Sequence, residues 1–200
     1  MLKAQMMKKI ASEIRMCVEC PLAEGRKNAI PGDGAIGAKV VFVGEAPGYW
    51  EDIKGSPFVG AAGKVLDGLL EWIGLARKHV FITNVVKCRP PENRDPKPME
   101  IAKCTSLYLD RQIGLIEPKV IVTLGRHSTA FVLHKAGFGK VDSITRFRGR
   151  TYDVAFLNLR LAVVPMYHPA SVLHNPRYRE DLESDFQLLK EELRKRRIIS

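Results

Sequence analysis

Four short apolar runs, separated by segments with helical periodicity, limit the folds open to this chain more than any other feature of its sequence. Continuous apolar runs of this length are typical of strands that are buried on both faces of a sheet. The runs are Lys39–Val43, Val80–Thr83, Lys119–Leu124 and Leu161–Met166. The sequence predicts helices at residues 2–16, 63–74, 99–115, 127–136 and 179–196. We therefore expect an α/β fold with a mostly parallel four-stranded sheet and helices on both faces.

The length fits one domain. At 200 residues, with 46% hydrophobic and 27% charged residues, the chain is long enough for one sizeable core and short for two. Residues 1–200 are therefore expected to form a single domain that closes with a C-terminal helix at about 179–196. Arg148–Val154 is a candidate hairpin edge of the sheet.

No targeting or membrane segment is predicted. Residues 1–16 carry Lys, Glu and Arg among their apolar residues, which argues against a signal peptide. No apolar run reaches the ~18 residues that a membrane span needs. We expect a cytoplasmic protein without a membrane partner.

Three polar side chains follow the carboxyl ends of different predicted strands. Glu45 comes after the first strand, Asn84 after the second and His168 after the fourth. In open α/β sheets, ligands bind beyond the carboxyl ends of the strands. We therefore expect all three side chains to face one cleft.

The charge balance favours a polyanionic partner. The chain has 32 Lys and Arg against 22 Asp and Glu, a net charge of +10. Basic surfaces bind nucleic acid because their contacts with phosphates release counterions. Charge alone is equally compatible with a basic surface that binds nothing.

The four cysteines point to a metal site. In a cytoplasmic chain, disulfides are disfavoured. Cys17 and Cys20 have the C-x-x-C spacing of a ligand pair, whereas Cys88 and Cys104 are too far apart for a compact zinc knuckle. The spacing favours an iron–sulfur cluster modestly and leaves zinc open, with free core cysteines as the remaining alternative.

Several motifs together resemble family 4 of the uracil-DNA glycosylases. They are Gly44-Glu-Ala-Pro-Gly48, Phe58, the segment Asn84–Pro91 and His168-Pro-Ala170, and the resemblance runs from the first cysteine pair to about Pro176. It implies the three-layer fold of that family and a monofunctional DNA-repair enzyme without lyase activity. Such an enzyme flips uracil out of single- or double-stranded DNA and hydrolyses its glycosidic bond, leaving an abasic site.

The resemblance also implies the cofactor and the site residues. It assigns a structural [4Fe-4S] cluster to Cys17, Cys20, Cys88 and Cys104. The residues expected to bind the substrate are Gly44, Glu45, Ala46, Glu51, Phe58, Asn84 and His168. The chain is expected to be a monomer. A sliding clamp is a conceivable partner, but the sequence contains no clear clamp-binding peptide.

The residue types fit the chemistry of base excision. Phe58 can stack on an extruded base, although a core position is the commoner fate of phenylalanine. The amide of Asn84 can pair with O4 and N3–H of uracil, whereas cytosine offers the opposite pattern. A strand-end asparagine that caps backbone groups is the alternative.

Glu45 and His168 are the expected catalytic residues. The Glu45 carboxylate can stabilise the positive charge that develops on the sugar and orient water, unless it is merely a solvated side chain. His168 can donate a hydrogen bond to uracil O2, for which a neutral imidazole suffices. The other four histidines, His79, His127, His134 and His174, are interpreted as surface or packing residues.

Two further roles follow from the resemblance. Glu51 is expected to meet the 5-methyl group and so exclude thymine, with a solvent-facing side chain as the alternative. Val172 or Leu173 is expected to fill the gap left by the flipped base, with packing at a helix start as the alternative. This chain departs from the family at Ala170, where serine is frequent, and at Tyr49-Trp50, where polar residues are frequent.

Other functions fit the sequence less well. The segment Gly60–Lys64 resembles a phosphate-binding loop, but Val65 stands where that motif requires Ser or Thr, which argues against ATP hydrolysis. A broader-specificity iron–sulfur glycosylase of the neighbouring family lacks a polar residue at the position of Asn84. A non-catalytic nucleic-acid-binding module with a metal staple leaves the convergence of the three polar side chains unexplained.

Overall fold

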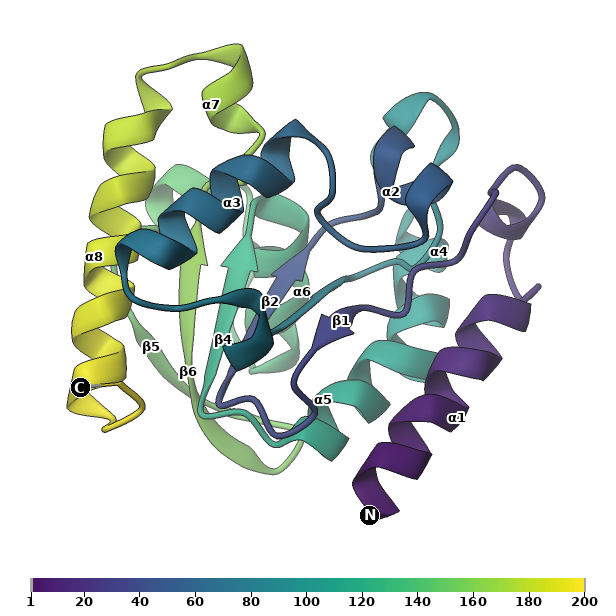
Figure 1. Ribbon diagram of the computed structural model, residues 1–200, viewed down its shortest axis with the longest axis horizontal. Coiled ribbons are helices and arrows are strands. Elements are labelled where there is room, and N and C mark those ends of the chain that lie inside the picture. The colour runs from purple at the N-terminus through teal and green to yellow at the C-terminus, as the bar shows by residue number, and fades with distance from the viewer. Residues whose placement is uncertain (1, 200) are drawn as a thin grey trace.

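A six-stranded sheet organises the computed structural model, which describes residues 2–199 (Figure 1). The strands lie in the order β1-β3-β2-β4-β6-β5. Their bounds are β1 Asp33–Gly34, β2 Val40–Gly44, β3 Phe81–Asn84, β4 Val120–Leu124, β5 Tyr152–Phe156 and β6 Leu159–Met166. The four central strands are parallel, and the two edge strands pair antiparallel to their neighbours. The α/β fold with a mostly parallel sheet is confirmed.

The sheet has more strands than the expected four because the two edge strands, β1 and β5, are not continuous apolar runs in the sequence. β1 has two residues and reads as a turn in the sequence. The predicted hairpin edge at Arg148–Val154 starts too early, since β5 begins at Tyr152. β5 connects to β6 through Leu157 and Asn158, whose φ angles of 49° and 64° suit a tight hairpin turn.

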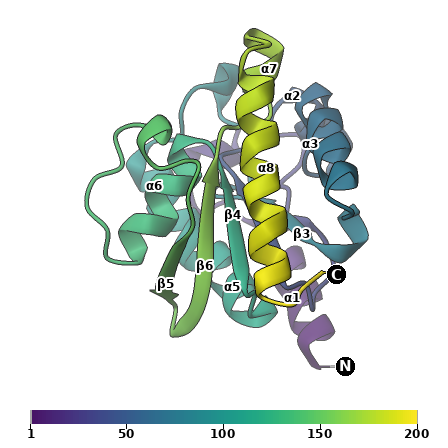
Figure 2. The same ribbon diagram turned by 90° about the vertical axis from the view of Figure 1, so that its left-hand side faces the viewer.

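Helices cover both faces of the sheet. Their bounds are α1 Leu2–Met16, α2 Tyr49–Lys54, α3 Ala61–Trp72, α4 Pro98–Cys104, α5 Asp110–Ile116, α6 Arg126–Lys135, α7 Ser171–His174 and α8 Tyr178–Lys195. Figure 2 shows α8 and α3 on one side of the strands and α6 on the other. The predicted helices at 2–16, 63–74, 127–136 and 179–196 are confirmed within two residues at each end. Among the residues described, no helix is long and apolar enough to cross a membrane.

Each buried strand divides its side chains between two cores. In β2, Val41 and Val43 pack with α1, α5 and α6, whereas Val40 and Phe42 pack with α3 and α8. This period of two is what a pleated strand imposes, and it explains why the strands read as continuous apolar runs. The two cores hold the carboxyl ends of the strands at one edge of the sheet.

The helix expected at residues 99–115 is interrupted. α4 ends at Cys104, a π-helical turn occupies Thr105–Leu109, and α5 continues from Asp110. The hydroxyl of Thr105 donates to the carbonyl of Ile101 at 2.8 Å inside this region. π-Helical turns are often found at functional sites, and this one directly follows a predicted metal ligand.

Candidate active site and cysteine site

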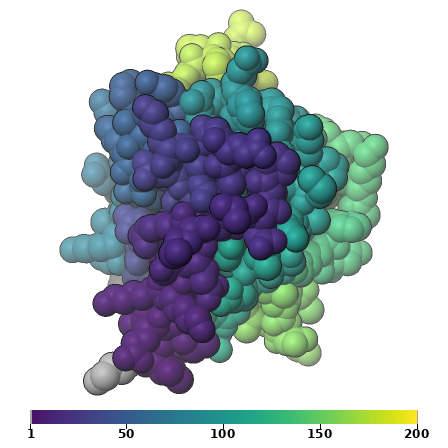
Figure 3. Space-filling view, turned by 90° about the vertical axis from the view of Figure 1, so that its right-hand side faces the viewer, coloured from purple at the N-terminus to yellow at the C-terminus, as the bar shows by residue number. Residues whose placement is uncertain are grey.

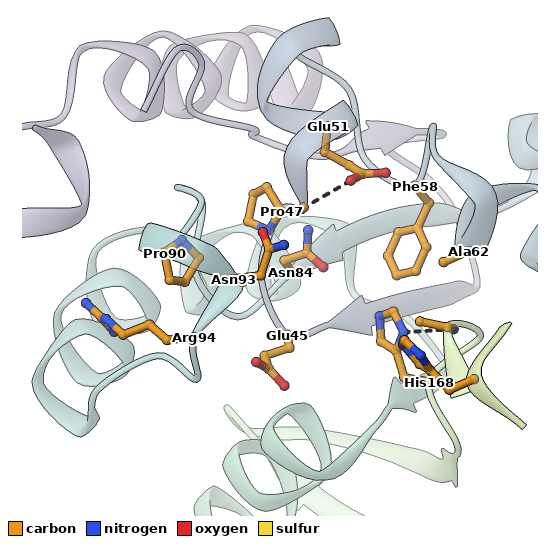
Figure 4. A pocket seen from close by; sticks show the side chains of 14 residues that line it. Glu45, Pro47, Glu51, Phe58, Ala62, Asn84, Pro90, Asn93, Arg94 and His168 are labelled. Atoms are coloured by element: carbon orange, nitrogen blue, oxygen red, sulfur yellow. Dashed lines mark hydrogen bonds between the residues drawn. The ribbon is translucent and has the colours of Figure 1, made fainter. Parts of the chain in front are cut away.

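The carboxyl ends of the parallel strands open onto one pocket of about 370 Å³. Figure 4 shows Glu45, Asn84 and His168 around a shared space, so the structure brings the three predicted side chains together. Gly44 pairs in register with Asn84, which places the ends of β2 and β3 side by side. The pocket is lined by Glu45, Ala46, Pro47, Gly48, Glu51, Phe58, Ala62, Asn84, Pro90, Asn93, Arg94, His168, Ala170 and His174.

Gly44 has no room for a side chain. A Cβ at this position would lie 2.3 Å from Asn84 Oδ1 and 2.8 Å from Phe58 Cζ. Real Cβ atoms do not approach other atoms so closely, so any larger residue would push both side chains out of place. The backbone of β2 at Gly44 thus packs directly against the side chains of Phe58 and Asn84.

The side-chain oxygen of Asn84 accepts no hydrogen bond from the protein. Its side chain is 2% exposed, and Oδ1 has no hydrogen-bond partner in the structure. An unpaired buried acceptor costs about 1–3 kcal/mol. Because Asn84 also lines the pocket, this oxygen is placed to receive an N–H group from a ligand.

His168 presents a neutral ring to the pocket. Its Nδ1 accepts a hydrogen bond from the backbone N–H of Ala170 at 3.1 Å. A neutral imidazole that accepts at Nδ1 carries its proton on Nε2. Desolvation lowers the pKa of His168 from 6.5 to about 4, and the nearby charge of Glu51 opposes this shift only in part. At neutral pH the ring is therefore an Nε2–H donor without charge.

Phe58 lies beside the ring of His168. The two ring centroids are 5.5 Å apart with an interplanar angle of 24°. A flat base between them would require about 7 Å, two stacking distances of about 3.5 Å. The arrangement therefore leaves no slot for a flat ring between Phe58 and His168.

The backbone of Phe58 is held in a conformation that non-glycine residues rarely adopt. Its φ angle is 52°. The guanidinium group of Arg77 donates to the carbonyl of Pro57 at 2.9 Å and to that of Phe58, while its Nε pairs with Asp67. α3 also approaches closely, since a Cβ on Gly63 would lie 1.8 Å from the Phe58 carbonyl oxygen. Such strain persists only where the surroundings impose it.

Glu51 fixes the same loop from the other side. One carboxylate oxygen accepts the backbone N–H groups of Val59 and Gly60 at 2.8 and 3.0 Å. The other accepts the N–H of Gly48 at 3.1 Å. Glu51 lines the pocket, and its contact with a thymine methyl group stays a prediction. Its carboxylate also joins two backbone segments, at Gly48 and at Val59-Gly60.

Glu45 has neighbours that the sequence reading missed. Nε2 of His127 lies 3.8 Å from Glu45 and 3.0 Å from Asp95, and Arg126 donates to Asp95 at 2.9 Å. Burial raises the pKa of Glu45, as does Asp95, whereas His127 and Arg126 oppose the rise. His127 was interpreted from the sequence as a surface or packing residue, and the structure places it beside Glu45. It follows the end of β4, so the strand-end argument that found Glu45 applies to it as well. His174, also dismissed, lines the pocket.

The four cysteines gather at a second place. None of them forms a disulfide, and all four line one small cavity between α1, the loop after β3, and α4. Figure 3 shows the N-terminal segment in purple packed against the teal middle of the chain, where these segments meet. Arg26 Nη1 donates to Cys88 Sγ at 3.0 Å. The cavity is lined by Ile14, Cys17, Glu19, Cys20, Lys87, Cys88, Lys103, Cys104, Leu107 and Tyr108.

Lys87 connects the two sites. Its side chain is 1% exposed, and Nζ donates to the Asn84 carbonyl at 2.9 Å, to Thr83 Oγ1 at 2.6 Å and to Gln112 Oε1 at 2.8 Å. Burial lowers the pKa of Lys87 to about 8. Lys87 precedes Cys88 and lines the cysteine cavity, so its hydrogen bond to the Asn84 carbonyl links the backbone at the pocket to the cysteine site. The sequence gives no pattern for this lysine, since its partners come from distant segments.

Comparison with known proteins decides the family. The model of the uracil DNA glycosylase superfamily matches residues 31–194. A type-4 uracil-DNA glycosylase of Saccharolobus solfataricus is 52% identical over 92% of this chain and 85% of its own length. One of Archaeoglobus fulgidus is 48% identical over 91% of this chain and 90% of its own. The chain belongs to the type-4 uracil-DNA glycosylases.

The neighbouring family matches less of the chain. A type-5 uracil-DNA glycosylase of Thermus thermophilus is 34% identical over 60% of this chain and 59% of its own length. The resemblance to family 4 drawn from the motifs is therefore confirmed.

The two candidates for DNA intercalation differ in exposure. Leu173 is 51% exposed on α7. Val172 is partly buried and packs against the core formed with α3 and α8. Of the two residues that the resemblance to type-4 enzymes offered, only Leu173 has a side chain largely free for a DNA groove.

Proposed function

We propose that this chain excises uracil from DNA by hydrolysing the glycosidic bond, releasing free uracil and leaving an abasic site. The observation that carries this proposal is the unpaired Oδ1 of Asn84 in a pocket that also holds the neutral donor of His168 and the carboxylate of Glu45. An acceptor, a donor and a negative charge around one cavity suit a pyrimidine with its sugar attached. The relatives' names and the family fit the same activity.

Four pocket residues have separate roles in the proposed reaction. The extruded base lies against Phe58, and Asn84 accepts its N3–H and donates to O4. As the C1′–N1 bond breaks, the electron pair stays on the base, and the Nε2–H of His168 stabilises the charge at O2. Glu45 stabilises the positive sugar and orients water for attack at C1′. The water supplies the hydroxyl group of the abasic site, and its proton offsets the charge of the released base.

We further propose that the enzyme is monofunctional. A lyase step needs an amine that attacks C1′ and forms a Schiff base. None of the residues that line the pocket, as described within residues 2–199, is a lysine. The nearby amine of Lys87 is buried and occupied by three acceptors.

The test is incubation of the purified protein with a single-stranded oligonucleotide that contains one uracil, followed by alkali. We expect scission at the uracil only after alkali, and free uracil in the supernatant. The same oligonucleotide with thymine is the control. No uracil release by protein with an intact metal site would disprove the activity, and scission without alkali would contradict the monofunctional assignment.

The four cysteines are proposed to bind a structural [4Fe-4S] cluster. Among residues 2–199, the one set of three potential metal ligands within 4.8 Å of one another is Glu45, Asp95 and His127, so the thiols are spread more widely. Tetrahedral zinc with bonds of ~2.3 Å would bring four sulfur atoms to about 3.8 Å from each other. A wider cluster fits these thiols better than a zinc ion. When bound, it would join α1 to the loop after β3 and to α4, with no step in the reaction.

Iron analysis and absorption spectra test the cluster. The pure protein should be brown, with broad absorption near ~400 nm. We expect Cys17→Ser and Cys104→Ser each to lose that absorption and to lower the unfolding temperature, because the cluster would no longer join the separate segments of the chain. Colourless protein with stoichiometric zinc would overturn the assignment.

A further inference from the structure

Two exposed aromatic side chains directly follow a residue that lines the pocket. Tyr49 and Trp50 start α2 directly after Gly48, which lines the pocket. They are 50% and 53% exposed, and their rings meet edge to face with centroids 5.2 Å apart. Neighbouring exposed aromatic rings beside a binding pocket are typical of an interaction surface.

Cations accompany both rings. The guanidinium group of Arg89 lies 5.1 Å from the centroid of Tyr49, and Nζ of Lys54 lies 5.8 Å from that of Trp50. Arg89 also donates to Asn93 Oδ1 at 2.8 Å, and Asn93 lines the pocket. The aromatic and cationic surface is therefore continuous with the pocket wall.

The acidic residues of α2 are turned away from this surface. Both oxygens of Glu51 accept backbone N–H groups. Asp52 is 4% exposed, and its Oδ1 accepts the N–H groups of Lys27 and Asn28 at 2.9 and 3.0 Å. α2 thus presents aromatic rings with positive charge to solvent and keeps its carboxylates inside, which complements a polyanion that carries flat bases.

We propose that Tyr49 and Trp50 form a stacking surface for the unpaired bases next to the extruded uracil, with Arg89 and Lys54 at the flanking phosphates. Proteins that bind single strands combine aromatic platforms with basic grooves in this way. The occupant is single-stranded DNA, because paired bases hide their faces within the duplex. The inference rests on the proposed function and adds a preference for substrates whose bases next to the uracil are unpaired.

Binding of a uracil-free, fluorescein-labelled single-stranded DNA oligonucleotide tests the surface separately from catalysis. We expect Trp50→Ala and Tyr49→Ala each to weaken binding about tenfold, because each removes one base stack. Trp50→Phe should retain most of the affinity. Trp72→Ala is the matched control. Trp72 is similarly exposed, at 51%, but lies at the C-terminal end of α3, whereas the N-terminal end of α3 lines the pocket. This variant should leave binding unchanged.

Uracil excision by the same variants supplies the second arm. Trp50→Ala and Tyr49→Ala should raise KM for single-stranded substrate, and they should raise it less for duplex substrate. Equal effects of Trp50→Ala and Trp72→Ala, or unchanged DNA affinity in Trp50→Ala and Tyr49→Ala, would overturn the inference and leave the surface to another partner. Failure of wild-type protein to release uracil, with tight binding that depends on Trp50, would instead refute the proposed function and retain the stacking surface.

Discussion

Replacing His168 with alanine is expected to slow uracil excision by roughly 100- to 1000-fold, the usual effect of removing one donor from a developing oxyanion. The reason is the loss of the Nε2–H that we propose faces the leaving base, while the proposed contacts of Asn84 and Phe58 with uracil remain. Single-turnover rates on a uracil oligonucleotide measure the chemical step. His79→Ala is the matched control. Nδ1 of His79 also accepts a local backbone N–H, at 3.2 Å from Ala76, but His79 lies at a different groove.

The pH dependence distinguishes a neutral His168 from a charged one. Because burial lowers its pKa from 6.5 to about 4, kcat/KM should show no acid limb from this group near pH 6.5. Protonation between pH 6.5 and 4 favours the unfolded chain, so stability that is complete above pH 6.5 should be lost as the pH falls toward 4. His168→Ala should remove this part of the loss. An activity limb near pH 6.5 that disappears in His168→Ala would contradict the neutral donor.

Changing Asn84 to aspartate is expected to lower the preference for uracil over cytosine by about 100-fold or more. In the proposed pairing, the native amide accepts N3–H and donates to O4, two hydrogen bonds of about 1–1.5 kcal/mol each. A buried aspartic acid in its protonated form donates to N3 of cytosine and accepts from the exocyclic amine. Release of each base from matched oligonucleotides gives the ratio directly.

Two controls make the selectivity experiment decisive. Asn84→Ala should lose uracil excision without gaining cytosine, because it removes both partners. Asn93→Asp tests another pocket asparagine, whose Oδ1 accepts from Arg89 instead of facing a free space. We expect it to leave the ratio unchanged. Unaltered selectivity in Asn84→Asp would refute the pairing scheme.

Much of the architecture was predictable because it depends on local patterns. The four central strands are short apolar runs, and their carboxyl ends fall at one edge of the sheet whatever the loops do. That was enough to place Glu45, Asn84 and His168 in one pocket. The same reasoning, extended to the residues after β4, would have found His127, which was instead interpreted as a surface or packing residue.

The sequence by itself determined the fold class, the family and the set of residues with the right chemistry, since hydrophobic period and motif spacing are carried by neighbours along the chain. Only the tertiary structure decided how those residues are held. Phe58 takes its strained backbone from Glu51 and Arg77, and Asn84 is positioned by Lys87 beside the cysteine site. Such contacts join distant segments, and their geometry exists only after the two cores have packed.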